Sequence, residues 1–67
     1  MAVARVTEVV ASSTKNWDDA VHVALKRANK TLRNITGIEV ISYKAKIENG
    51  KISEYRVTLK ITFILEE

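Results

Sequence analysis

Residues 52–65 read ISEYRVTLKITFIL, an almost unbroken alternation of apolar and polar side chains. Successive side chains of a β-strand point to opposite faces, so this pattern predicts one long strand with an apolar face and a polar face. The apolar face is formed by the odd positions: Tyr55, Val57, Leu59, Ile61, Phe63 and Leu65. Strands usually have about 5–6 residues, so a strand of this length needs cover on one face and partners along its edges.

The cover is predicted to be a helix from about Lys15 to Asn34, because apolar side chains recur there at steps of three and four. Among the hydroxyl residues that precede it, Ser13 is the predicted N-cap. Gly37 follows within a few residues and is the predicted stop at the C-terminal end. The predicted apolar stripe consists of Trp17, Ala20, Val21, Ala24, Leu25, Ala28, Leu32 and Ile35.

Two further strands are predicted, one over Val3 to Val10 and one starting near Ile38. The element order is then β-α-β-β, and residues 1–67 form a single α+β domain. One helix covers one face of a three-stranded antiparallel sheet, and the other face stays polar. The last strand spans about 45 Å and the helix about 30 Å, so the strand outreaches its cover. Its ends and one of its edges are expected to meet other subunits.

The last two strands are joined by a tight turn, because residues 48–51 read ENGK. A two-residue loop would place the apolar odd positions of one strand beside the polar even positions of the other. We therefore predict a three-residue loop over residues 48–50, with Gly50 in the left-handed conformation. In this register Tyr43 lies opposite Tyr55, and both rings belong to the buried face.

Length and composition favour self-association. A lone core of 67 residues is marginal. The chain has no cysteine and one histidine, which excludes disulfides and argues against a structural zinc site. The net charge of +3 is mild and mainly supports solubility.

The sequence predicts a cytoplasmic protein without a membrane partner. No apolar stretch approaches the roughly 18–20 residues of a membrane span, and Arg5 and Glu8 interrupt the segment that a signal peptide would need to be apolar. Nucleic acid is not a predicted partner, because basic residues populate the polar sheet face without an aromatic residue on that face.

No catalytic residue is predicted, and the protein is not expected to be an enzyme. His22 is the only histidine and lies on the polar side of the helix, without a partner that would make it a general base. Trp17 is expected to pack in the core or at an interface. No metal ligand is assigned, although Glu66 and Glu67 could bind a hard cation such as Ca²⁺ if neighbouring chains brought them together.

Several segments, taken in order, resemble the dodecin family over nearly the whole chain. They are Ser12-Ser13 before NWDDA at 16–20, KTLRN at 30–34, Glu39-Val40, YRVTLK at 55–60 and FILE at 63–66. The resemblance implies a hollow, roughly spherical homododecamer. It also implies binding of riboflavin or related flavins as stacked pairs between subunits, for storage or scavenging and not for catalysis.

Two positions that match the family's flavin contacts carry other residues. Where flavin-binding dodecins have a Trp that stacks on the isoalloxazine, this chain has Gly37; where they have a Gln that bonds the polar edge of the ring, it has Arg56. Stacking of a base on an aromatic side chain is worth roughly 1–3 kcal/mol per ring. Arginine has no acceptor, so it cannot replace both functions of an amide.

Three interpretations therefore stay open. The protein is a dodecin-like shell that has lost flavin-pair binding and stores another small ligand or ion, with calcium or an anion at Arg56 as candidates. Alternatively, it retains weak binding of riboflavin or FMN. In the third interpretation the shell is purely structural, Gly37 is only a helix stop, and Arg56 forms a cross-strand or inter-subunit ion pair with Glu39 or Glu54.

Overall fold

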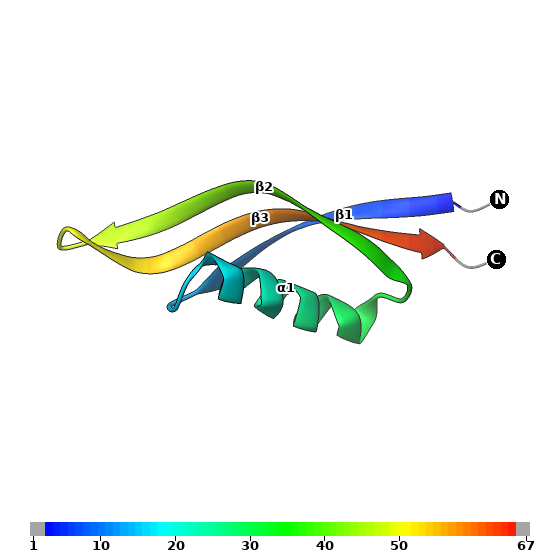
Figure 1. Ribbon diagram of the computed structural model, residues 1–67, viewed down its shortest axis with the longest axis horizontal. Coiled ribbons are helices and arrows are strands. Elements are labelled where there is room, and N and C mark those ends of the chain that lie inside the picture. The colour runs from blue at the N-terminus through cyan, green and yellow to red at the C-terminus, as the bar shows by residue number, and fades with distance from the viewer. Residues whose placement is uncertain (1–2, 66–67) are drawn as a thin grey trace.

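The computed structural model describes residues 3–65 as a three-stranded antiparallel sheet with one helix on one of its faces (Figure 1). The elements are β1 (Val3–Ser13), α1 (Trp17–Thr31), β2 (Ile35–Glu48) and β3 (Lys51–Leu65). The long alternating strand β3 lies in the centre, in the order β1-β3-β2. Both of its edges pair within the chain, so the expected open edge belongs to the outer strands instead. The predicted β-α-β-β fold is confirmed. Within residues 3–65, no helix is long and apolar enough to cross a membrane.

The core lies between α1 and the middle of β3. Three odd positions of β3, Val57, Leu59 and Ile61, are buried, as the alternation predicts. The helix meets the sheet through alanines at steps of four, Ala20, Ala24 and Ala28, and their small side chains let the two layers approach closely. Fully burying one Leu or Ile side chain contributes about 1.5–3 kcal/mol, so these three strand residues anchor the layers.

The helix starts later than predicted, and its N-cap is Asn16 instead of Ser13. The Asn16 side chain accepts a hydrogen bond from the backbone N–H of Asp19 at 2.6 Å. Ser13 is still the last residue of β1, paired with Tyr55, so its backbone is committed to the sheet. Its hydroxyl instead donates to Asp19 Oδ2 at 2.6 Å and accepts from the N–H of Lys15 at 2.9 Å.

The helix also ends earlier than predicted, at Thr31, and Gly37 is not its stop. The C-cap is Leu32, whose N–H donates to the carbonyl of Ala28 at 2.8 Å. Asn34 adopts the left-handed conformation at φ 60°, which asparagine tolerates better than most residues. Gly37 lies inside β2 opposite Thr62, because the strand already begins at Ile35.

The hairpin between β2 and β3 has a two-residue turn, so the predicted loop length and register are wrong. Asn49 and Gly50 have φ of 52° and 74°, as a tight turn with two left-handed residues requires. Gly50 therefore has the predicted conformation. A β-bulge next to Ile47 solves the parity conflict that argued against the short loop, and it places Tyr43 opposite Val57.

The protomer is strongly elongated, with extents of 52 × 19 × 13 Å and a Cα radius of gyration of 13.8 Å. A compact chain of this length would have a radius of about 11 Å. Its accessible surface is 5195 Å², against about 4,200 Å² for a typical monomer of this mass. Figure 1 shows the reason: the turn of the β2–β3 hairpin projects well beyond the N-terminal end of α1.

Candidate small-ligand site on the open face of the sheet

The two predicted site residues, Gly37 and Arg56, lie on the same face of the sheet, the one turned away from α1. Val57 and Ile61 face the helix, so the even positions of β3 face the other way. Arg56 pairs with Lys44 of β2, and Gly37 pairs with Thr62 of β3. Positions 56 and 62 are six residues apart, which is about 20 Å along a strand. One chain therefore does not bring the two together, and a small ligand that contacts both takes them from different chains.

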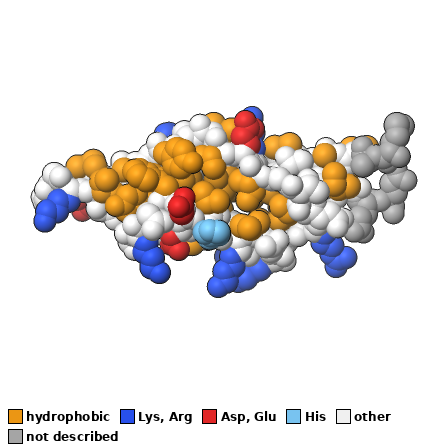
Figure 2. All heavy atoms as spheres, viewed as in Figure 1, with side chains coloured by type: hydrophobic (Ala, Val, Ile, Leu, Met, Phe, Trp, Pro, Cys, Tyr) orange, Lys and Arg blue, Asp and Glu red, His pale blue; other side chains and the backbone are white. Residues whose placement is uncertain are grey.

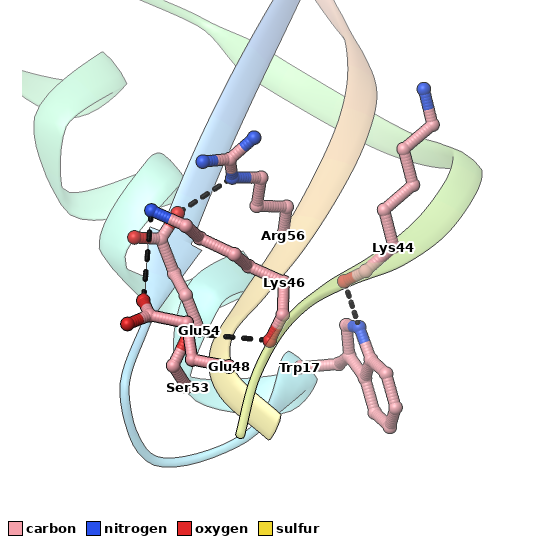
Figure 3. Close-up of polar contacts among 7 residues, drawn as sticks. All are labelled: Trp17, Lys44, Lys46, Glu48, Ser53, Glu54 and Arg56. Atoms are coloured by element: carbon pink, nitrogen blue, oxygen red, sulfur yellow. Dashed lines mark hydrogen bonds and ion pairs between the residues drawn. The ribbon is translucent and has the colours of Figure 1, made fainter. Parts of the chain in front are cut away.

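Arg56 is held by an acidic neighbour on its own strand. Its Nε donates to Glu54 Oε1 at 2.6 Å, and Lys46 Nζ lies 3.7 Å from Glu48 Oε1 close by (Figure 3). The hydrogen bond from Arg56, assisted by the charges of Arg56 and Lys46, lowers the pKa of the Glu54 carboxyl. Of the two partners left open, Glu54 forms the ion pair, but along one strand and not across strands or between subunits as expected.

Gly37 leaves room for a larger side chain. Apart from its chain neighbours, no atom of the described residues lies within 4 Å of a Cβ built at this position. The backbone is that of a strand, without the positive φ that strains other residues. Nothing within residues 3–65 prevents a larger side chain at position 37, so crowding does not explain the glycine there.

The aromatic side chains gather on the opposite face, around the start of α1. Trp17 packs edge-on against Tyr55 at a centroid distance of 4.8 Å and against Tyr43 at 6.0 Å. Its indole N–H also donates to the carbonyl of Lys44 at 2.9 Å (Figure 3). The predicted packing role of Trp17 is confirmed. Phe63, the remaining ring, has the parity of the helix side, so among residues 3–65 no aromatic ring faces the open side.

Tyr43 differs from the prediction, because it is 61% exposed instead of buried. Its parity is that of the helix side, but it lies beside the very start of α1, with the ring of Trp17 at a centroid distance of 6.0 Å. Half-buried Tyr55 has the same ring closer, at 4.8 Å. Parity alone predicts the face of a residue, whereas burial also requires that another element reach it.

The other candidates remain separate from this face. His22 is exposed on α1. The described residues contain no group of three or more His, Cys, Asp or Glu that could hold a metal ion. Glu66 and Glu67, which could bind a cation only if neighbouring chains brought them together, lie outside the described residues.

A groove of about 530 Å³ between the outer edge of β1 and α1 escaped the sequence reasoning. It is lined mainly by small and apolar side chains, including Val9, Val23 and Ala28, with Arg27 among them. Its existence depends on β1 being an edge strand, and this strand order is not encoded in any local pattern.

Comparison with known proteins agrees with this fold. Residues 3–66 match the family model for dodecin. The chain belongs to the dodecin family. A curated dodecin from Thermus thermophilus is 38% identical over 60 residues, which is 90% of this chain and 87% of that protein.

Solved structures show the same architecture. The dodecin of Streptomyces coelicolor matches with a TM-score of 0.95 and 42% identity, over 98% of this chain and 94% of that one. A protein from Mycobacterium tuberculosis described as a calcium dodecin with a novel calcium-binding site matches with a TM-score of 0.83 and 28% identity, over 96% and 91% of the two chains. Dodecins are small ligand-binding proteins that self-associate, and this dodecin shares their protomer fold.

Proposed function

We propose that this dodecin assembles as a hollow homododecamer that binds and stores a small ligand, and that it binds flavin pairs more weakly than dodecins with a stacking Trp. The observation that carries the proposal is the open face of the sheet, where Gly37 supplies no ring and no other described aromatic side chain replaces it. The residues present therefore fit a stacked flavin pair poorly.

The magnitude of the loss follows from stacking. One stacked ring contributes roughly 1–3 kcal/mol, and each 1.4 kcal/mol is tenfold in affinity. Loss of the ring then costs about 5- to 160-fold for each flavin. Arg56 adds to the loss, because a guanidinium only donates hydrogen bonds and its Nε is already engaged by Glu54.

The same residues suit an anionic group better. Arg56 lies opposite Lys44 across the β2–β3 pair, and both side chains are exposed. Glu54 engages Arg56 through Nε, while the two terminal nitrogens of a guanidinium carry further donors. Two adjacent cations of this kind favour a carboxylate or a phosphate, which Arg binds in a forked geometry.

Calcium is the second candidate, supported by the likeness to the calcium dodecin of Mycobacterium tuberculosis. The described residues of one chain provide no cluster of acidic ligands. A calcium site in this protein therefore needs carboxylates from more than one chain or from beyond residue 65. A rise in melting temperature on adding Ca²⁺, absent with Mg²⁺, is the expected sign of such a site.

Titration of riboflavin fluorescence with the wild type and two variants tests the flavin proposal. We expect little quenching by the wild type at micromolar flavin. Gly37→Trp should strengthen binding by at least about fivefold, the low end of the stacking contribution, and Gly37→Trp combined with Arg56→Gln should strengthen it further. Native mass spectrometry should give about 90 kDa, twelve chains of 7.5 kDa, for all three proteins.

Two outcomes contradict the proposal. One is wild-type protein that quenches riboflavin as strongly as the double variant, which shows that the ring and the amide are not needed. The other is a wild-type mass of one chain, which removes the assembly. Loss of assembly in the variants alone is recognised by their mass and does not bear on the flavin site.

A further inference from the structure

The positive charge of this protein is concentrated on the helix. Residues 20–38 contain four basic residues, Lys26, Arg27, Lys30 and Arg33, and no Asp or Glu. The whole chain has 11 basic and 8 acidic residues, so the remainder has 7 and 8, a net charge of −1 against +4 for this segment. The net charge of +3 therefore originates from residues 20–38, because the first turn of α1 carries Asp18 and Asp19.

Two of these side chains, Lys26 and Lys30, point away from the sheet, whereas Arg27 lines the groove beside β1. All four are exposed. Two positions along a helix correspond to a rotation of about 200°, so Lys26 and Lys30 lie opposite the buried Ala24 and Ala28. Figure 2 shows Lys and Arg side chains projecting along the lower margin of the molecule, the side on which α1 lies in Figure 1.

Most basic residues on the open sheet face have an acidic neighbour, and those of the helix do not. Arg56 pairs with Glu54 and Lys46 with Glu48. Lys60 lies between two acids across the sheet, Glu8 of β1 and Glu39 of β2. Neither of the two ion pairs found within residues 3–65 involves a base of α1. Like charges at i and i+4 destabilise a helix slightly, as with Lys26 and Lys30, so this row is costly without an anionic partner.

We propose that the exposed face of α1 is a binding surface for an anionic polymer of phosphate groups. A row of exposed cations binds such a polymer by displacing its condensed counterions, without reading any sequence. A membrane surface is the weaker fit, because α1 turns its apolar face onto the sheet and the only large exposed hydrophobic residue on it is Val23. The expectation that nucleic acid does not bind is based on the open sheet face, and α1 lies on the other side of the sheet.

The surface is independent of the proposed small-ligand site, because it uses neither Gly37 nor Arg56. If the chain assembles as proposed, each copy adds an identical row of cations, and one polymer can engage several rows. Linked contacts of this kind raise the overall affinity without any new contact in the single chain.

The test measures binding of long-chain inorganic polyphosphate at 50 mM salt to the wild type and two double variants. The helix variant is Lys26→Gln/Lys30→Gln, and the hairpin variant, its control, is Lys46→Gln/Lys51→Gln. Both double variants lower the charge by two per chain, but the second removes its charges from the hairpin. The helix variant should bind polyphosphate at least about tenfold more weakly than the wild type. Its slope of log K against log salt concentration should be shallower by about 1.4, as loss of two contacts to a single-stranded polyanion predicts.

The hairpin variant should bind within about twofold of the wild type, and Lys26→Arg/Lys30→Arg should retain binding because it keeps both charges. Native mass spectrometry of each variant excludes loss of assembly as the cause. Single-stranded RNA of equal charge separates the sources of phosphate, and capture of either polymer through the helix supports the proposal. Absence of binding to both polymers, or equal weakening in the helix and hairpin variants, overturns it.

Discussion

The Glu54 carboxyl links the ion pair with Arg56 to pH. The hydrogen bond from Arg56, with the charges of Arg56 and Lys46, lowers the pKa of Glu54 from its usual value of 4.5. A carboxyl group whose pKa is lower in the folded state contributes stability above its unfolded pKa and loses that contribution as pH falls through the folded pKa. The pair therefore contributes at neutral pH and is lost below about pH 4.5.

Replacing Arg56 by Gln should move the pKa of Glu54 back up toward 4.5, because the principal donor and the nearest charge are both removed. A carbon NMR titration of glutamate-labelled protein measures the shift directly. Lys51→Gln is the matched control, since it removes a hairpin charge that does not contribute to the lowered pKa of Glu54. An unchanged Glu54 pKa in the Arg56 variant, or an equal change in the control, would contradict the assignment.

Among the elements, the start of α1 gives the sharpest test of the local structure. Asn16→Ala should destabilise the protein by about 1 kcal/mol, because the N–H of Asp19 loses its acceptor. Asn16→Ser should recover most of this loss, since serine is also a good N-cap. Chemical denaturation of the two variants measures the difference, and equal losses would show that Asn16 does not act as a cap.

The same elements show what periodicity can predict. The alternation along β3 predicts a long strand and the face of each of its side chains, because a period of two determines that face, but it does not predict that this strand is the central one. It does not predict the register, since a three-residue loop and a two-residue turn with a bulge both keep apolar positions opposite each other. Periodicity also predicts too long a helix, because Ile35 fits the spacing of the apolar stripe. In the structure, Asn34 adopts a left-handed conformation and the chain enters β2 at Ile35.

At the scale of the whole molecule, a single chain leaves many large hydrophobic side chains exposed. Among residues 3–65, nine large hydrophobic side chains are exposed. Three of them, Tyr43, Ile47 and Ile52, lie on the hairpin arm, the part of the β2–β3 hairpin nearest its turn (residues 43–55). Figure 2 shows hydrophobic side chains gathered over this arm and between it and α1. Soluble monomers rarely expose contiguous apolar patches of this kind. The candidate site is also incomplete in a single chain, because Gly37 and Arg56 are too far apart to contact one small ligand. It could not be predicted fully from the sequence, because patterns within one chain contain no information on the geometry between chains.

Polar substitution of the arm should therefore weaken the assembly more than it weakens the protomer. Burial of an Ile or aromatic side chain contributes about 1.5–3 kcal/mol, and Tyr43 and Ile47 are 61% and 60% exposed in the single chain. The double variant Tyr43→Ser/Ile47→Ser loses this contribution in every copy that buries them against a neighbour. Native mass spectrometry should show smaller species, down to the 7.5 kDa chain, while circular dichroism shows a retained helix. Lys51→Ser, on the same arm, should leave the assembly intact. If the double variant still forms the full assembly, the arm lies free of the subunit contacts, and the groove beside β1 becomes the surface to test next.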